Sequence, residues 1–212
     1  MIRVDKSANI PESLLTTQAY DGQDVQQQLL QDQHQKCYLC ECKVEPNYHI
    51  EHLNSQANRQ DWKNLFLSCG YCNDKKLALF DNILNPTTNN IEKIIEQRLD
   101  TYSKEAVFRS NDNSTEVKQT IKLLENIFNG KEHDPNFRSS HEKVFYDKTE
   151  MLINDFMRKV TNYRLNSSQT NEAIVREELA IDKEMLGFKY WIIRDEPTLN
   201  AVFAKDIIWN KQ

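Results

Sequence analysis

The sequence predicts an α+β protein that is mostly α-helical, in which a small cysteine-containing unit precedes a helical bundle. Two short apolar segments, residues 48–53 and 65–68, have the length and composition of strands. In the second half of the chain, apolar residues recur every three or four positions over long stretches, which is typical of amphipathic helices. We therefore expect residues 1–85 to form an N-terminal arm and a compact core, and residues 86–212 to form a mainly helical domain.

The first half contains several short elements. In order, we expect an extended arm over residues 1–20, a helix over 24–35, strands over 48–53 and 65–68, and a helix from Asn73 to about Leu84. The last helix stops before Pro86, because proline cannot continue a helix. Trp62, between the strands, is expected to fill the core. Residues 85–90 are rich in turn formers and mark the expected boundary of the first unit.

The second half is dominated by helical spacing. We expect helices over residues 115–129, 139–166, 171–185 and 197–208, with an aromatic and apolar run over 188–193. The first of them has Ser114 or Thr115 as its N-cap and ends at Gly130. Residues 91–99 also have helical spacing, whereas residues 106–109 alternate, so a helix and a β-hairpin both remain open for this region.

Composition limits the possible settings and partners. The chain has 212 residues and a net charge of −5, whereas proteins that bind nucleic acid unaided are often basic. Residues 36–80 contain six basic and five acidic residues, so this segment is nearly neutral. No apolar run approaches the roughly 18 residues of a membrane span, and no signal peptide is recognisable. We expect a cytoplasmic protein without membrane contact.

Four of the five cysteines form two Cys-x-x-Cys pairs, Cys37/Cys40 and Cys69/Cys72, separated by 28 residues. Each pair can hold a metal ion from a single turn, and two pairs complete a tetrahedral structural Zn²⁺ site. Two disulfides or a redox dithiol are weaker interpretations, because nothing indicates an oxidising compartment and a redox motif uses one pair. Cys42 is expected to be a small packed residue.

A second set of polar residues lies between and just after the cysteine pairs: His49, Glu51, His52, Asn64, Asn73 and Lys76. This set resembles the HNH endonuclease superfamily, whose ββα-metal unit has an acidic residue and a His ending its first strand. The family also has an Asn in the connecting loop and a His or Asn opening its helix. The resemblance implies Glu51 as metal-binding acid, His52 as general base, Asn64 as the middle residue, Asn73 as second metal ligand and Lys76 as the helix lysine.

The chemistry of phosphodiester hydrolysis gives these positions a physical reason. An imidazole is neutral near pH 7, so His52 can deprotonate a water molecule, and the Asn64 carbonyl can accept its other ring N–H. Oxygen ligands from Glu51 and Asn73 favour Mg²⁺ or Mn²⁺, which would neutralise charge on the departing oxygen. Asn73 stands where the family commonly has a third His, which leaves the metal preference open.

The position of His49 leaves an alternative. In a regular strand, His49 and Glu51 share one face and His52 points away, since side chains alternate. Either the strand breaks at Glu51, so that Glu51 and His52 both reach the metal, or His49 takes part instead. The resemblance favours His52 as the base, with His49 as a third ligand or a phosphate contact.

A narrower resemblance comes from the order of the segments. The arm, the HNH-like unit and the segment 120–124 leading to Asn129-Gly130 are similar to the PtuB-type HNH proteins of Septu and related retron anti-phage systems. This implies a defence nuclease that works beside a PtuA-type ATPase, with the helical half as the docking surface. The alternative is a zinc-stabilised module that binds nucleic acid or protein without cutting. The sequence does not distinguish DNA from RNA as substrate.

Overall fold

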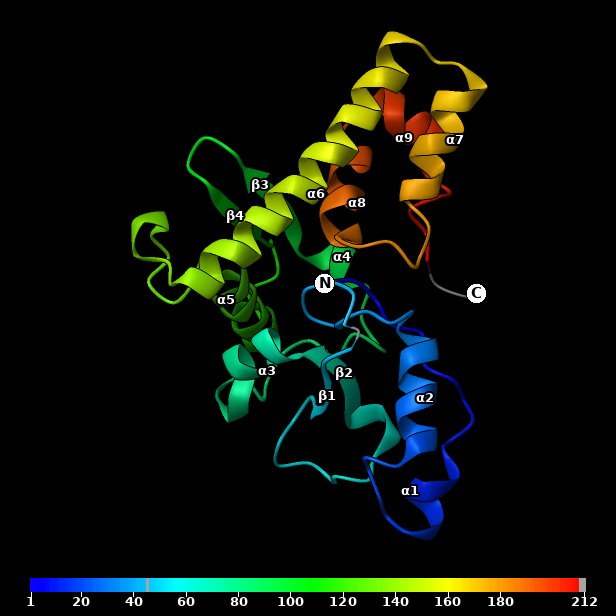
Figure 1. Ribbon diagram of the computed structural model, residues 1–212, viewed down its shortest axis with the longest axis vertical. Coiled ribbons are helices and arrows are strands. Elements are labelled where there is room, and N and C mark those ends of the chain that lie inside the picture. The colour runs from blue at the N-terminus through cyan, green and yellow to red at the C-terminus, as the bar shows by residue number, and fades with distance from the viewer. Residues whose placement is uncertain (45, 210–212) are drawn as a thin grey trace.

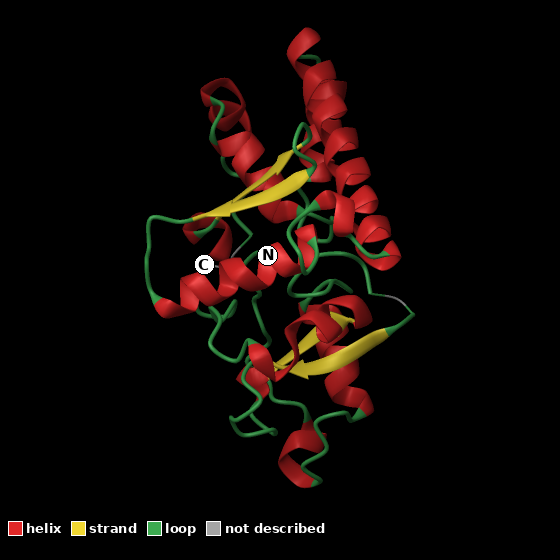
Figure 2. Cartoon of the chain, turned by 90° about the vertical axis from the view of Figure 1, so that its left-hand side faces the viewer, coloured by secondary structure: helices red, strands yellow, loops and turns green. Residues whose placement is uncertain are grey.

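The computed structural model describes residues 1–44 and 46–209; residues 210–212, at the end of the second predicted domain, lie outside the described part. About half of the chain is helical, and each of the two small antiparallel sheets has two strands (Figures 1 and 2). In chain order the elements are α1 (Glu12–Thr16), α2 (Gln23–Asp32), β1 (Tyr48–His52), η1 (Trp62–Asn64), β2 (Leu65–Cys69), α3 (Gly70–Lys76), η2 (Leu77–Leu79), α4 (Ile91–Ile94), β3 (Glu96–Asp100), β4 (Glu105–Arg109), α5 (Thr115–Asn129), η3 (Pro135–Phe137), α6 (Ser140–Leu165), α7 (Gln169–Glu178), α8 (Leu186–Arg194) and α9 (Pro197–Phe203). The η elements are short 3₁₀ helices.

The first sheet and the helix after it confirm the expected order of two strands and a helix. β1 pairs with β2 in antiparallel register, from Tyr48 opposite Cys69 to His52 opposite Leu65. β2 continues without a loop into α3 at Gly70. Figure 1 shows this unit together with α1 and α2 in the lower half of the molecule. The continuity matters for the site, because the strand end and the helix start are fixed relative to each other.

The predicted helix from Asn73 to Leu84 is wrong in its extent. α3 begins at Gly70 and ends at Lys76, and Leu77 has a φ of +44°, which stops the helix. Leu77 and Leu79 are exposed. Phe80 and Ile83 are buried, although they lie in an irregular segment after the helix. Apolar residues at helical spacing therefore reach the core here without forming one helix.

The arm packs on the body as expected, but it is not extended throughout, because α1 interrupts it. Val4 N–H donates to the Pro86 carbonyl at 2.9 Å, and the Trp62 indole donates to the Ser7 carbonyl at 3.0 Å. Trp62 is buried, so its predicted place in the core is confirmed. The arm thus covers the loop that joins β1 to β2.

Residues 91–109 resolve the alternative that the sequence left open. α4 is a single turn, and β3 and β4 then form a hairpin from Glu96 opposite Arg109 to Asp100 opposite Glu105. The Asn129 side chain, at the end of α5, exchanges two hydrogen bonds of 2.7 Å with the backbone of Ala106. The helical half is therefore not a pure bundle, because a hairpin packs against α5 and α8.

Two of the predicted long helices are confirmed. α5 ends at Gly130, whose φ of +85° suits glycine. α6 begins with a capping box, in which Ser139 and Glu142 bond reciprocally to backbone N–H groups. In the described part of the chain, no helix combines the length and the apolar character needed to cross a membrane.

The last helices are shorter than predicted. α7 ends at Glu178 rather than near residue 185. Met185, with a φ of +57°, is the residue directly before α8. α8 contains the predicted apolar run, and α9 ends at Phe203 instead of Ile208. Leu179 and Ile207 are buried outside the helices, so burial again extends beyond helical structure.

The hydrophobic core crosses the predicted boundary between the two halves. One cluster contains Leu29 and Phe66 from the first half together with Leu124, Phe128 and Phe188 from the second. A smaller cluster, formed by residues of α6 to α9 and the segments after them, lies in the upper half of Figure 1. The boundary at residues 85–90 stays a prediction. Residues of both halves pack in one hydrophobic cluster.

Buried Glu41 adds a polar connection between the halves. Its carboxylate accepts hydrogen bonds from the backbone N–H groups of Leu186 (2.8 Å) and Gly187 (3.0 Å) at the start of α8, and it lies 2.7 Å from the Met1 ammonium. Burial alone would raise the pKa of Glu41, but the Met1 ammonium and Lys36 outweigh it, so the pKa is lowered. The carboxylate is therefore charged and fully paired.

We predict that Glu41→Gln lowers the free energy of unfolding by about 3–5 kcal/mol, because it leaves buried partners unpaired. Urea denaturation at pH 7 measures this, and Glu132→Gln, at an exposed position, is the control. The pKa of Glu41 is lowered from 4.5, so its contribution is present above pH 4.5 and is lost as the pH falls through the folded-state pKa. Equal midpoints for the two variants would contradict the assignment.

Candidate zinc centre and the adjoining polar pocket

The four paired cysteines meet at one point. The sulfur atoms of Cys37, Cys40, Cys69 and Cys72 all lie within 4.8 Å of one another, and the Cys40 and Cys69 sulfurs are 3.8 Å apart. A tetrahedral ion with Zn–S bonds of about 2.3 Å separates its sulfur ligands by about 3.8 Å. The predicted grouping is confirmed, and its geometry fits a single metal ion such as zinc.

Local backbone structure explains why the pairs converge. The first pair lies in a tight turn, where Glu41 N–H donates to the Cys37 carbonyl at 2.9 Å and Glu41 adopts a φ of +62°. Tyr38 N–H donates to the Leu67 carbonyl at 3.0 Å, which ties this turn to β2. Cys69 ends β2 and Cys72 lies in the first turn of α3. Two strand-linked turns therefore face each other across the cluster.

The electrostatics of the cluster favour a bound cation. Burial raises the pKa of the Cys40 and Cys72 thiols, while hydrogen bonds from Cys37 and its neighbours lower that of Cys69. Four adjacent sulfurs, three of them on buried residues, cannot all be deprotonated unless a positive charge compensates them. Cys42 is buried but lies outside the group, as the sequence analysis expected.

A polar pocket lies along β1 and α3, and α3 also carries Cys72 of the cysteine group. It has a volume of about 220 Å³. Its lining consists of Tyr20, Ile50, Glu51, His52, Ser55, Arg59, Asn73, Lys76 and Leu77. The structure thus brings together four of the predicted site residues, namely Glu51, His52, Asn73 and Lys76. β1 does not break at Glu51 but continues through His52, and both residues still line the pocket.

Glu51 and Lys76 form a buried ion pair within this pocket. Glu51 is 9% exposed and Lys76 only 1%. The Lys76 ammonium lies 2.8 Å from Glu51 Oε1 and donates to the His52 carbonyl at 3.0 Å, while the Tyr38 hydroxyl donates to Glu51 Oε2 at 3.1 Å. Burial raises the pKa of Glu51 above its ordinary value, although Lys76 and Tyr38 act in the opposite direction.

His52 is held in one orientation by the loop that follows β1. Its Nε2 lies 3.1 Å from the Arg59 carbonyl oxygen. A carbonyl oxygen only accepts hydrogen bonds, so Nε2 carries the proton and Nδ1 keeps its lone pair. Partial burial lowers the pKa of His52, which favours the neutral ring at pH 7. These properties suit a general base acting through Nδ1.

Asn64 does not bond to the His52 ring, contrary to the expectation from the chemistry of phosphodiester hydrolysis. Its Oδ1 accepts a hydrogen bond from the Asn54 N–H at 2.9 Å, and its Nδ2 donates to the Asn54 carbonyl at 3.0 Å. The ring N–H of His52 goes to Arg59 instead. Asn64 therefore braces the loop after β1, and it positions His52 through the backbone rather than by direct contact.

His49 is separated from the pocket. It is exposed on β1 and lies beside Gly70, where an added Cβ would be 3.5 Å from His49 Nε2. It lines a neighbouring surface depression with Tyr20, Tyr48 and other residues, but not with His52 or Asn73. His49 is therefore not among the residues that line the pocket with Glu51, His52 and Asn73.

Sequence reasoning gave no role in the site to Tyr20 or Arg59. Tyr20 comes from the segment between α1 and α2, and its ring meets the His52 ring edge-on at 5.0 Å. The Arg59 guanidinium lies 4.9 Å from the centre of the Tyr20 ring. The sequence signalled Arg59 only as one of several positive charges, and it held no signal for Tyr20, because their proximity to His52 depends on folding.

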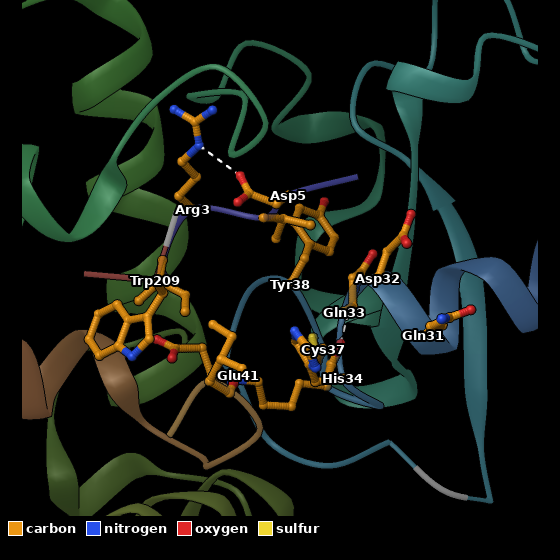
Figure 3. Close-up of a pocket in the computed structure, with 14 residues that line it drawn as sticks. Arg3, Asp5, Gln31, Asp32, Gln33, His34, Cys37, Tyr38, Glu41 and Trp209 are labelled. Atoms are coloured by element: carbon orange, nitrogen blue, oxygen red, sulfur yellow. Dashed lines mark hydrogen bonds and ion pairs between the residues drawn. The ribbon is translucent and has the colours of Figure 1, made fainter. Parts of the chain in front are cut away.

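A separate cavity of about 260 Å³ lies between the arm, the end of α2, the first cysteine turn and Trp209 (Figure 3). Its polar side chains are occupied with fold contacts: Asp32 accepts from the Ser7 N–H at 2.8 Å, and Lys36 donates to the carbonyls of Ile181 and Lys183. Burial lowers the pKa of Lys36 to about 8. This cavity connects parts of the fold and holds no predicted site residue other than Cys37.

Comparison with protein-family models, with curated proteins and with solved structures finds no match for this chain. The interpretation of the two centres therefore depends on their own geometry and chemistry.

We predict one zinc ion per chain, which Cys69→Ser abolishes together with most of the folded structure, because the β1–β2 unit loses its anchored ends. Elemental analysis and circular dichroism measure the two effects. Cys42→Ser is the matched control, since Cys42 is also buried but lies outside the sulfur group. Folded protein without zinc, or zinc loss in the control, would refute the assignment.

Proposed function

We propose that this protein is an HNH-type endonuclease that hydrolyses phosphodiester bonds at the pocket between β1 and α3. The observation that carries the proposal is the convergence of Glu51, His52, Asn73 and Lys76 on one pocket. They come from the end of β1 and from α3, which directly follows the strand that pairs with β1. A module that only binds a partner does not require this combination.

His52 acts as the general base in this proposal. Its Nδ1 takes a proton from the attacking water, while the Arg59 carbonyl accepts the Nε2 proton and keeps the tautomer fixed. The lowered pKa of His52 keeps the base unprotonated near neutral pH. Tyr20 packs against the ring and limits its rotation.

Glu51 and Asn73 would hold the catalytic Mg²⁺ or Mn²⁺. Both line the pocket, and a carboxylate with an amide oxygen is a donor set that hard cations accept. When bound, the ion neutralises negative charge that develops on the phosphate and on the leaving oxygen. Arg59 and Lys76 add positive charge at the same pocket, where they would contact the substrate phosphate.

We further propose that the chain works in an anti-phage complex with a PtuA-type ATPase, as in Septu and related retron systems. The net charge of −5 offers little unaided attraction for nucleic acid, whether DNA or RNA. The helical half exposes several large apolar side chains, among them Phe137, Val144 and Met151, which favours a protein interface there. This half would dock the partner, and the cytoplasm is the setting that such a complex requires.

A zinc-stabilised binding module remains the second candidate, and one observation favours it. The Glu51 carboxylate is already paired with Lys76 and Tyr38, so the network also stabilises the fold without any reaction. Cleavage assays separate the two functions.

We predict that His52→Ala abolishes Mg²⁺-dependent cleavage of plasmid or total RNA while zinc content and thermal stability stay unchanged. The reason is that His52 is half-exposed, so losing its contacts with the Tyr20 ring and the Arg59 carbonyl costs little stability. His141→Ala, an exposed histidine on α6, is the control and should cut normally. Normal cleavage by His52→Ala combined with a dead His49→Ala would show that the base is misassigned.

We also predict that the isolated chain cuts weakly and gains activity in complex with its ATPase, because the partner supplies phosphate contacts that this acidic chain lacks. Size-exclusion chromatography and cleavage at physiological salt compare the chain alone with the co-expressed pair. A monomer that cuts equally fast alone and in company would end this part of the proposal.

A further inference from the structure

The Lys76 ammonium is surrounded by oxygen atoms of the kinds that also bind metal ions. Its ammonium is almost completely buried and contacts Glu51 Oε1 at 2.8 Å and the His52 carbonyl at 3.0 Å, with Asp81 Oδ1 at 3.9 Å. Carboxylate and backbone carbonyl oxygens are also the ligands that hard divalent cations use. The pocket therefore already contains a cation at the carboxylate that would bind a metal.

Both carboxylate oxygens of Glu51 already have a partner in this arrangement. Lys76 takes Oε1 and the Tyr38 hydroxyl takes Oε2. A divalent ion at Glu51 would lie next to the Lys76 ammonium, and like charges at short range in a buried site repel strongly. The Glu51–Lys76 ion pair therefore opposes metal binding at Glu51.

We propose that Lys76 occupies the cation position at Glu51 and that a divalent ion binds only when the Lys76 ammonium moves to another anion. This inference rests on the proposed nuclease function, and the phosphodiester of the substrate is the anion that it names. Lys76 lines the pocket, so a phosphate there gives the ammonium a new partner. The same phosphate gives the metal further oxygen ligands, which Mg²⁺ usually needs in addition to one or two carboxylates. The catalytic metal and the nucleic acid then bind together, and the free chain stays without that metal.

The test is calorimetric titration of Mn²⁺ into the zinc-loaded chain without nucleic acid. We expect weak binding by the unaltered chain and binding tighter by at least about tenfold in Lys76→Met. Lys75→Met is the matched control, because the neighbouring Lys75 pairs with Glu142 rather than with Glu51, and it should behave like the unaltered chain. Adding Glu51→Gln to Lys76→Met should remove the gain, which places the ion at Glu51.

Lys76→Gln is the second variant in case Lys76→Met does not fold, since an amide can donate hydrogen bonds in the pocket without carrying a charge. Equal or weaker Mn²⁺ binding in the Lys76 variants overturns the proposal. Tight Mn²⁺ binding by the unaltered chain overturns it as well, whatever the variants do. If the Lys76 variants gain Mn²⁺ affinity but no form of the protein cuts nucleic acid, the nuclease function fails and the competition between Lys76 and the metal stands.

Discussion

The four-cysteine group is the constraint on which the first half of the structure depends. It joins a turn after α2 to the point where β2 becomes α3. A two-stranded sheet is only marginally stable by itself, and α3 is too short to form alone. A metal bound to four thiolates would compensate for both weaknesses, because it would fix the strand end and the helix start in one place.

Buried charges then set the geometry around this anchor. The Glu51–Lys76 pair connects β1 to the last residue of α3, directly beside the cysteine unit. Glu41, within the first cysteine turn, reaches the start of α8 and so connects the same unit to the second half. Each of these groups is costly to bury unless it is paired. Their contacts therefore favour one arrangement of the elements over others with similar hydrophobic burial.

The polar pocket combines rigid and less rigid contributors. Glu51, Asn73 and Lys76 come from β1 and α3, and β1 pairs with β2, which continues directly into α3. Arg59 and Tyr20 come from loops, and Asn64 holds the first turn of one of these loops through the Asn54 backbone. A site of this construction can keep its charged groups in place while its rim adapts to a ligand.

The sequence by itself determined that four cysteines form one group, that two strands precede a helix, and that α5 and α6 are helices. These features depend on local spacing: two Cys-x-x-Cys motifs, short apolar segments, and long stripes bounded by Ser139 or Gly130. Local pattern was insufficient to locate helix ends where a loop buries apolar residues that have helical spacing. Phe80, Ile83 and Ile207 are buried without helical structure, so the predicted helices ran too long.

Only the tertiary structure decided which side chains meet in the pocket. It shows a β3–β4 hairpin in place of a helix, and the Asn129 side chain, 23 positions from Ala106, bonds to the Ala106 backbone in β4. Asn64 bonds to the loop backbone instead of the His52 ring. Tyr20 and Arg59 line the pocket, whereas His49 lines a neighbouring depression. The fold also pairs Glu51 with Lys76. Such contacts join residues far apart in the chain, and their energy depends on burial and desolvation, which the spacing of residues in a sequence does not encode.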